Sequence, residues 1–144
     1  MKVNFIKTEK NVPVPSKSTS GSAGFDLTAH ITEAINLLPG IPVKIPTGIA
    51  IEPDTLGCVI LLFSRSGLSK YGVGLANAVG VIDSDYRGEI GAVFINNSNT
   101  EYVISPGDRI AQIVFLNIEP VELELVESLT DTERGDGGFG HSGK

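Results

Sequence analysis

The chain has 144 residues, of which 41% are hydrophobic and 19% charged, and its formal net charge at pH 7 is −6. This length predicts one domain with a buried core, and this composition excludes both a disordered polyampholyte and a membrane span. The acidic balance argues against a general nucleic-acid partner, because such binding normally needs a basic face. Seventeen glycines, eight prolines and the absence of tryptophan argue against a helical bundle.

Short apolar runs rich in β-branched residues alternate with turn residues along most of the chain. Runs about 8–12 residues apart are typical of an all-β sandwich or barrel. Helical potential is confined to one turn at Ser66–Lys70. The expected strands, in chain order, are Val3–Ile6, Phe25–Thr28, Ile35–Leu38, Pro42–Ile45, Gly48–Ile51, Val59–Phe63, Ile90–Ile95, Tyr102–Ile104, Ile110–Ile118 and Val121–Val126.

Cys58 is the one cysteine, so an internal disulfide and a zinc site built from several cysteines are both excluded. It lies in an apolar run, where a small buried side chain is favoured over a reactive thiol. The N-terminus lacks the apolar segment of a signal peptide, and no stretch approaches about 18 apolar residues. We therefore expect a cytoplasmic protein, or one that is otherwise intracellular or virus-encoded, without membrane contact.

Beyond Val126 the chain turns polar and glycine-rich. Taken alone, this composition indicates a disordered tail. Glycines beside Arg134 and Phe139 favour a second interpretation, because flexible backbone amides can converge on an anion while an aromatic ring stacks on a base. At this point both interpretations stay open: an all-β domain over residues 1–128 is followed, over residues 129–144, by a disordered tail or by a mobile arm that closes over a site.

The spacing Gly135-x-Gly137-x-x-Gly140 matches the fingerprint of dinucleotide-binding folds. That fingerprint needs a strand before it and a helix after it, and only four residues follow here. We therefore reject that fold. The chain also lacks the nucleophile elbow, the zinc-protease motif and the dithiol motif, so carboxylates and arginines are the expected chemical groups.

Five polar segments are candidates for a functional site. Asp26 interrupts an apolar strand, and an inward carboxylate needs arginine, amide or metal partners. Ser64–Gly67 sets an arginine between hydroxyls and a glycine, which makes a compact cradle for an oxyanion. Asn77–Gly88 is expected to form a long β-hairpin with acids at its tip. For these segments, for the turn Gly107–Gln112 and for residues 134–140, the alternative is an ordinary loop, surface ion pair or tail.

In this order the five segments resemble the five motifs of the trimeric dUTPase family, over a match from about Ser22 to Ser142. One such motif is weak evidence, but five in order are specific. The resemblance implies a distorted jelly-roll β-barrel, in agreement with the strand pattern. It also implies hydrolysis of dUTP to dUMP and pyrophosphate with Mg²⁺, which limits uracil in DNA and supplies dUMP for thymidylate synthesis. The matching stretches are Ala23-Gly24-Phe25-Asp26-Leu27, Arg65-Ser66-Gly67-Leu68, Gly80-Val81-Ile82-Asp83-Ser84-Asp85-Tyr86-Arg87-Gly88, Gly107-Asp108-Arg109-Ile110-Ala111-Gln112 and Arg134-Gly135-Asp136-Gly137-Gly138-Phe139-Gly140.

The resemblance assigns roles around the nucleoside. Asp83 would orient and deprotonate the water that attacks the α-phosphorus, a task that requires hydrogen-bond reach of that water. The ring of Tyr86 would pack against the deoxyribose and leave no room for a 2′-hydroxyl. Phe139 would stack over uracil. Further contacts along uracil and sugar would come from Asn77 and from the main chain of Val81, Ile82 and Gly91.

The resemblance likewise assigns the phosphate contacts. Asp26 and Arg109 would be supporting charges, and Asp26 would also hold a metal-bound water. Triphosphate oxygens and water would carry most of the Mg²⁺ coordination, which suits the water-retaining habit of that ion. The phosphates would be bound by Arg65, Ser66 and Gly67, with Gln112 nearby, and by Arg134 and the backbone of Gly135–Gly140.

In this family three subunits of a homotrimer build each site. One chain supplies the first, second and fourth motifs, a second supplies the hairpin and a third supplies the arm. Such sharing would gather cations at the interfaces and so explain how an acidic chain binds a tetra-anion. Two positions depart from the common pattern, and neither removes a catalytic group. Ser64 stands where proline or glycine is frequent, and His141-Ser142 stands where Ser-Thr is common.

Two other functions compete with this prediction. A related deaminase of dCTP shares the fold and the trimer, but it needs a glutamate proton shuttle near the base. A non-catalytic binding or regulatory protein could also keep the fold, although intact Asp83, Tyr86, Arg65 and Phe139 argue against it. Pyrophosphate release from dUTP, compared with dCTP and UTP, distinguishes the hydrolase from the other two functions.

Overall fold

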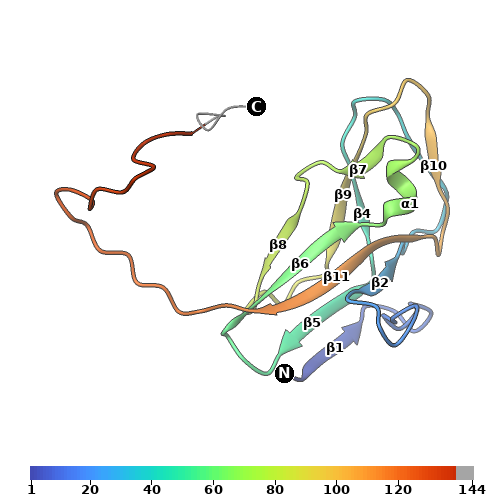
Figure 1. The fold of residues 1–144 in the computed structure, drawn as a ribbon. Helices are drawn as coiled ribbons and strands as arrows, with labels where there is room; N and C mark the ends of the chain where they lie inside the picture. Colours follow the sequence, from blue (N-terminus) through green and yellow to red (C-terminus); the bar gives the residue numbers. More distant parts are fainter. Residues whose placement is uncertain (139–144) are drawn as a thin grey trace.

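Strands account for nearly all of the regular structure (Figure 1). The structure is a computed structural model that describes residues 1–138. The all-β prediction is confirmed, and so is the single helical turn. No helix within residues 1–138 is long and apolar enough to cross a membrane. The elements are β1 (Val3–Lys7), β2 (Phe25–Thr28), β3 (Ile35–Leu37), β4 (Val43–Pro46), β5 (Ile49–Pro53), β6 (Cys58–Ser64), α1 (Ser66–Ser69), β7 (Val73–Leu75), β8 (Gly80–Asp83), β9 (Gly91–Asn96), β10 (Tyr102–Ile104) and β11 (Arg109–Asn117).

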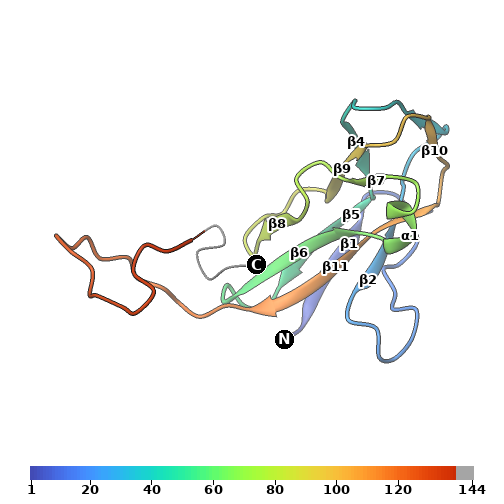
Figure 2. The same cartoon turned by 45° about the horizontal axis from the view of Figure 1, so that its top comes forward.

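The described strands pair into four antiparallel sheets. The largest has the order β2-β11-β6-β8, and the second has the order β4-β9-β7. Two strand pairs, β1-β5 and β10-β3, complete the body. Figure 2 shows β6 and β11 side by side, with β8 on the far edge of β6. The sheets do not close into one barrel, and this arrangement is compatible with the expected distorted jelly roll.

The core lies between the sheets and is built from the inward side chains of alternating strands. In β9, Ala92 and Phe94 are fully buried, whereas Val93 between them is exposed. Burying each large aliphatic or aromatic side chain stabilises the fold by about 1.5–3 kcal/mol. Cys58 is 2% exposed, so the prediction of a buried thiol is confirmed. The outward face of β9 is therefore free to line a site.

The predicted hairpin over Asn77–Gly88 is wrong in its pairing. A tight turn does follow β8, because the Tyr86 amide donates to the Asp83 carbonyl at 3.1 Å. However, β8 pairs with β6, while β9 pairs with β4 and β7. The two arms of the expected hairpin thus enter different sheets and diverge. Before β8 the chain bends sharply at Ala78, which has a φ of 60° in the left-handed region.

The predicted strand at Val121–Val126 is also wrong. In the described part of the chain, the last strand ends at Asn117, and residues 118–138 lead away from the body without helix or strand (Figure 1). Leu125 is 99% exposed. The alternation of apolar and acidic side chains suits a strand, but a strand also needs the backbone groups of a neighbour. Within one chain this segment has no such neighbour among residues 1–138.

The buried side chain of Asn96 closes the end of β9, and we expect its loss to destabilise the fold. Its Nδ2 donates to the carbonyls of Leu37 at 2.8 Å and Thr100 at 2.7 Å, and its Oδ1 accepts from the Ser98 amide at 2.9 Å. Asn96→Ala should lower the free energy of unfolding by about 1–3 kcal/mol, because buried polar groups lose their partners. Denaturant unfolding at fixed protein concentration measures this. The exposed Asn99→Ala is the control, and equal stability of both variants would contradict the prediction.

Candidate active site

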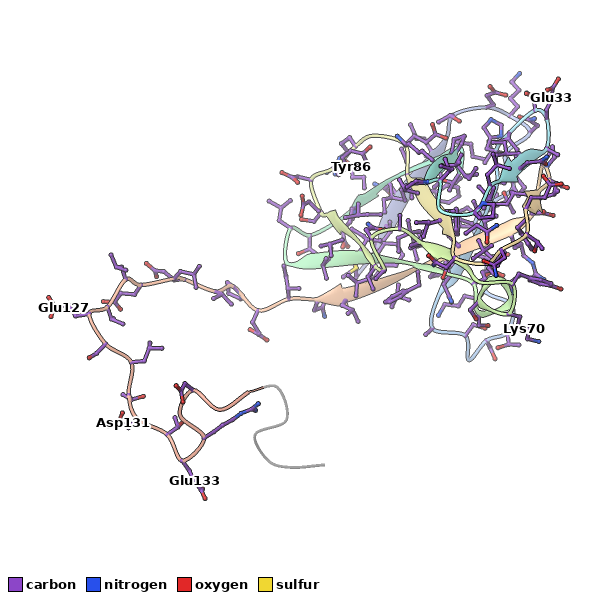
Figure 3. The ribbon with its side chains drawn as sticks, turned by 90° about the horizontal axis from the view of Figure 1, so that it is seen from above. Glu33, Lys70, Tyr86, Glu127, Asp131 and Glu133 are labelled. Carbon is purple, nitrogen blue, oxygen red and sulfur yellow. The ribbon has the colours of Figure 1, made fainter. Side chains whose placement is uncertain are left out.

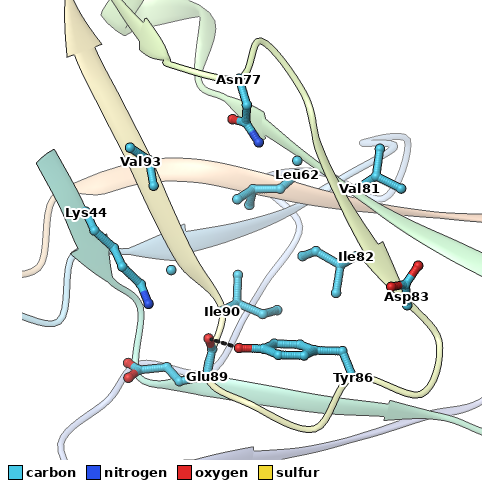
Figure 4. Close-up of a pocket in the computed structure, with 12 residues that line it drawn as sticks. Lys44, Leu62, Asn77, Val81, Ile82, Asp83, Tyr86, Glu89, Ile90 and Val93 are labelled. Carbon is cyan, nitrogen blue, oxygen red and sulfur yellow. Dashed lines mark hydrogen bonds between the residues drawn. The ribbon is translucent and has the colours of Figure 1, made fainter. Parts of the chain in front are cut away.

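A cavity of about 270 Å³ opens where β8 and β9 diverge (Figure 4). If β8 and β9 had paired with each other in the expected hairpin, this space would not exist. Its lining combines charged and polar side chains with apolar ones and with two glycines, Gly80 and Gly91, which is a mixture typical of sites for small molecules. Six of the residues predicted from the sequence line this cavity: Asn77, Val81, Ile82, Asp83, Tyr86 and Gly91.

Asp83 ends β8, opposite Val59 of β6, and its side chain is exposed. The turn that follows is tied down from two sides. Ser84 Oγ donates to the Leu56 carbonyl at 3.0 Å, and Arg87 Nη1 donates to the Ser84 carbonyl at 2.8 Å. The carboxylate therefore projects into solvent from a backbone that is well held, which suits a group that must meet a water molecule.

The ring of Tyr86 forms one wall of the cavity (Figure 4). Its hydroxyl donates to the Glu89 carbonyl at 3.2 Å. A Cβ atom at Gly88 would lie 2.3 Å from that hydroxyl, so the ring packs directly on the Gly88 backbone. The side chain is 46% exposed, and its free face is turned to the cavity. This geometry can exclude a small group from the space beside the ring.

Two charged residues of the cavity, Lys44 and Glu89, were missed by the sequence reasoning. Lys44 faces Val93 across the β4–β9 pair, and a Cβ at Gly91 would lie 2.3 Å from its Cε. Because Gly91 has no side chain, the aliphatic part of the Lys44 side chain can pass over β9 at this position. No local motif marks Lys44, because only the pairing of two distant strands brings it to the cavity.

A second cluster of predicted residues surrounds Asp26 on β2. The carboxylate is 13% exposed, and its Oδ1 forms an ion pair with Arg65 Nε at 3.2 Å. Its Oδ2 accepts from Arg109 Nη1 and Ser18 Oγ, each at 3.2 Å. Gln112 lies opposite Asp26 in β11, and its Oε1 would be 2.8 Å from a Cβ at Gly24. Two arginines around one carboxylate leave an excess positive charge, so this cluster can attract an anion.

The sheet places the rest of the predicted cradle beside this cluster. β6 ends at Ser64, and the Arg65 amide donates to the Ile110 carbonyl at 3.1 Å. Ser66 and Gly67 follow in α1 and are exposed. A cavity of about 370 Å³ opens here, lined in part by the two arginines, Gly67, Tyr102 and Asp108. Burial, together with the charge of Asp108, raises the pKa of Tyr102 above its ordinary value.

Asp83 and Arg65 lie toward opposite ends of β6, a strand shown in Figure 1. Asp83 stands opposite Val59, and Arg65 follows six residues further along the chain. At about 3.3 Å per residue, this places the two groups roughly 20 Å apart. One chain therefore does not bring the predicted base and the predicted phosphate cradle together.

The arm is a third, separate part (Figure 3). Arg134 Nε donates to the Gly137 carbonyl at 2.9 Å, and Gly135 has a φ of +54°, so residues 132–137 form a local turn. Arg134 lines neither cavity. Two further predicted residues, Phe139 and Gly140, lie outside the described residues.

Comparison with known proteins agrees with the motifs. The family model for dUTPase matches residues 10–143. A deoxyuridine 5′-triphosphate nucleotidohydrolase of Desulfitobacterium hafniense (strain DSM 10664 / DCB-2) is 48% identical over 99% of this chain and 95% of its own length. The enzyme of that name from Klebsiella pneumoniae subsp. pneumoniae is 47% identical over 100% of this chain and 95% of its own length.

Solved structures show the same fold. A mutant dUTPase of Staphylococcus bacteriophage 80alpha, solved with dUpNHpp, aligns with a TM-score of 0.83 at 27% identity over 99% of both chains. A mutant dUTPase from phage phi11 of S. aureus, whose structure describes a structural Mg(II) ion, aligns with a TM-score of 0.79 at 26% identity, over 91% of this chain and all of the other. The prediction from the five motifs is confirmed, and the chain belongs to the dUTPase family.

Proposed function

We propose that this protein hydrolyses dUTP to dUMP and pyrophosphate, as a homotrimer whose subunits share each active site. The cavity between β8 and β9 carries the proposal, because Asp83, Tyr86 and Gly91 line it together. The relatives named as dUTP nucleotidohydrolases support the same reaction. The direct test is pyrophosphate release by the purified chain, with dUTP compared against dCTP and UTP. Release from dUTP alone is expected, and preference for either competitor would refute the proposal.

The cavity suits a uracil nucleoside. Uracil presents one N–H donor between two carbonyl acceptors, and strand main chain offers the complementary groups. Val81 and Ile82 on β8 and Gly91 on β9 would supply them, with the amide of Asn77 at the cavity rim. Selection through fixed backbone dipoles discriminates strongly, because an unmatched base leaves buried polar groups unpaired.

Asp83 would be the general base. Its exposed carboxylate would accept a proton from the water that attacks the α-phosphorus, and the anchored turn would keep it in line. General-base catalysis of this kind contributes about 10²–10⁴ in rate. The reaction breaks the bond between the α-phosphorus and the bridging oxygen, so that dUMP and pyrophosphate leave.

The cluster around Asp26 would hold the phosphates. Arg65, with Ser66, Gly67 and Gln112, would contact phosphate oxygens, while Arg109 would compensate the charge of Asp26. Its separation of roughly 20 Å from Asp83 along β6 supports a site in which the cradle of one subunit meets the base of another. In this arrangement the β-sheet body of each chain contributes two incomplete half-sites to two different active sites.

Mg²⁺ is the cofactor that we propose. Both oxygens of Asp26 already form ion pairs with arginines, so this carboxylate suits a hydrogen bond from a metal-bound water better than direct ligation. The remaining ligands would be triphosphate oxygens and water, as Mg²⁺ prefers. When bound, the ion withdraws charge from the phosphate oxygens. The structure of the phage phi11 relative describes a structural Mg(II) ion, which supports the choice of this ion.

The arm, residues 129–144, would close over the nucleotide of a neighbouring site. Arg134 and the backbone of Gly135–Gly140 would contact the outer phosphates, and Phe139 would stack on uracil. The described part of the arm contributes no side chain to the core of its own chain. An arm that is not needed for the core is free to serve another subunit.

Phe139→Ala is expected to impair catalysis without affecting stability. Stacking of a base on an aromatic ring is worth about 1–3 kcal/mol, which corresponds to roughly one to two decades in kcat/KM. If Phe139 belonged to the core, its truncation would cost about 3–5 kcal/mol of folding stability. Steady-state kinetics and thermal unfolding of the ligand-free protein distinguish a stacking role of Phe139 from a position in the core. A large drop in the unfolding midpoint would refute the role in stacking.

Tyr86→Ala is expected to relax the discrimination between deoxyribose and ribose. Removing the ring opens space for a 2′-hydroxyl, so the ratio of kcat/KM for UTP to that for dUTP should rise by about ten- to a hundredfold. Phe5→Ala, which removes a part-exposed ring on β1 outside the cavity, is the control. An unchanged ratio in Tyr86→Ala would mean that another residue excludes the ribose.

A further inference from the structure

The carboxylate of Glu89 ties the loop that carries Tyr86 to the turn between β4 and β5. Its Oε1 accepts from the backbone amide of Gly48 at 2.6 Å. Glu89 is half-buried and Gly48 is buried, so water does not compete freely for this bond. A short hydrogen bond to an ionised acceptor is about twice as strong as one between neutral groups.

The Gly48 side of this bond is rigid. Gly48 has a φ of +71°, and a Cβ there would lie 2.4 Å from Val12 Cγ2 and 3.1 Å from His30 Cγ, so only glycine fits. Its carbonyl accepts from the Thr8 amide at 2.8 Å. The preceding Thr47 is fully buried, and its Oγ1 donates to the Ile90 carbonyl at 2.6 Å. The amide that Glu89 accepts is thus fixed on the body of the protein.

The backbone of Glu89 contacts the candidate site. The backbone carbonyl of Glu89 accepts from the hydroxyl of Tyr86 at 3.2 Å (Figure 4), and the ring packs on the Gly88 backbone. The next amide, Ile90, donates to the Ile49 carbonyl at 2.8 Å. Through its side chain and its own carbonyl, Glu89 therefore connects the Gly48 turn to the ring that lines the cavity.

We propose that Glu89 is a positioning residue that fixes the ring of Tyr86 and thereby sharpens the exclusion of ribonucleotides. This inference rests on the proposed function and names a specificity determinant for it. A displacement of about 1 Å at a site can cost a hundredfold in rate, so discrimination by a ring depends on how firmly the ring is held. Without the carboxylate, the loop that carries Tyr86 loses its hydrogen bond to Gly48. The ring of Tyr86 can then move aside when a 2′-hydroxyl is present.

The test compares Glu89→Ala with Glu89→Gln in the full chain. The glutamine keeps an oxygen acceptor of the same reach, whereas alanine removes it. The ratio of kcat/KM for UTP to that for dUTP should rise by about three- to tenfold in Glu89→Ala and stay within about twofold of wild type in Glu89→Gln. Glu33→Ala, which removes an exposed carboxylate from the β2–β3 loop, is the matched control and should leave the ratio unchanged.

A second measurement is independent of activity. Hydrogen exchange at the Gly48 amide should accelerate by about tenfold or more in Glu89→Ala and remain slow in Glu89→Gln. If the wild-type protein did not turn over dUTP, the proposed function would be refuted. Hydrogen exchange at the Gly48 amide would still show whether the hydrogen bond from that amide to Glu89 is present. An active wild type with an unchanged ratio in a folded Glu89→Ala variant would overturn the positioning role alone. Equal changes in the alanine and glutamine variants would overturn it as well, since charge rather than the hydrogen bond would then be responsible.

Discussion

Replacing Asp83 with asparagine is expected to lower kcat for dUTP by about 10²–10⁴ while leaving nucleotide affinity nearly unchanged. The amide has the shape of the carboxylate but cannot take a proton from the attacking water. Because Asp83 is exposed at the end of β8 and does not belong to the core, the fold should be unaffected. Single-turnover hydrolysis beside a binding titration separates the chemical step from binding.

Asp54→Asn is a suitable control for this experiment. Asp54 is an exposed acid directly after β5, outside the cavity, and its substitution changes the net charge by the same amount. It should hydrolyse dUTP at the wild-type rate. Near-normal single-turnover rates in Asp83→Asn would reject Asp83 as the base, and a parallel loss in both variants would indicate a general effect of charge.

Deleting residues 134–144 is expected to lower kcat/KM by at least about a hundredfold, because phosphate contacts and water exclusion both depend on closure. The stability of the body should be retained. The arm residues from Arg134 to Gly138 contribute nothing to the buried core, and their hydrogen bonds are local to the turn. Kinetics with dUTP and thermal unfolding of the truncated chain measure both expectations.

A shorter deletion gives the matched comparison. Removing only His141–Lys144 keeps Arg134, Phe139 and Gly140, so most of the activity should remain. Full activity after deletion of residues 134–144 would show that the segment is only a tail. A lowered unfolding midpoint in the longer deletion would instead show that the arm supports the fold.

Local pattern predicted the strands well where turn residues delimit them. Val59–Phe63 falls within β6, because an unbroken apolar run before Ser64 has no other suitable structure. β7 was missed, since three residues centred on Gly74 give no periodicity to detect. The strand expected at Val121–Val126 failed for the opposite reason, as its alternation is clear but its own chain offers no edge to pair with.

The site was predicted residue by residue but not as an arrangement. Asn77, Asp83 and Tyr86 could be singled out because they lie within one short motif. That the two arms of the motif diverge could not be deduced, because pairing of β8 with β6 depends on tertiary packing. Lys44 and Glu89 are held at the cavity by residues far away in the sequence, Gly91 and Gly48 respectively. No short sequence motif therefore marks either residue.

Mixing two inactive variants tests the central claim, that dUTP is hydrolysed at a site shared between subunits. Asp83→Asn lacks the base and Arg65→Ala lacks the cradle, and each alone should be nearly inactive as a homotrimer. In trimers assembled from equal amounts of both, about one quarter of the sites would combine an intact cradle with an intact base from the neighbouring subunit. The account predicts recovery of about one quarter of wild-type dUTP hydrolysis after co-refolding. Mixed trimers that remain as inactive as their parents would contradict it.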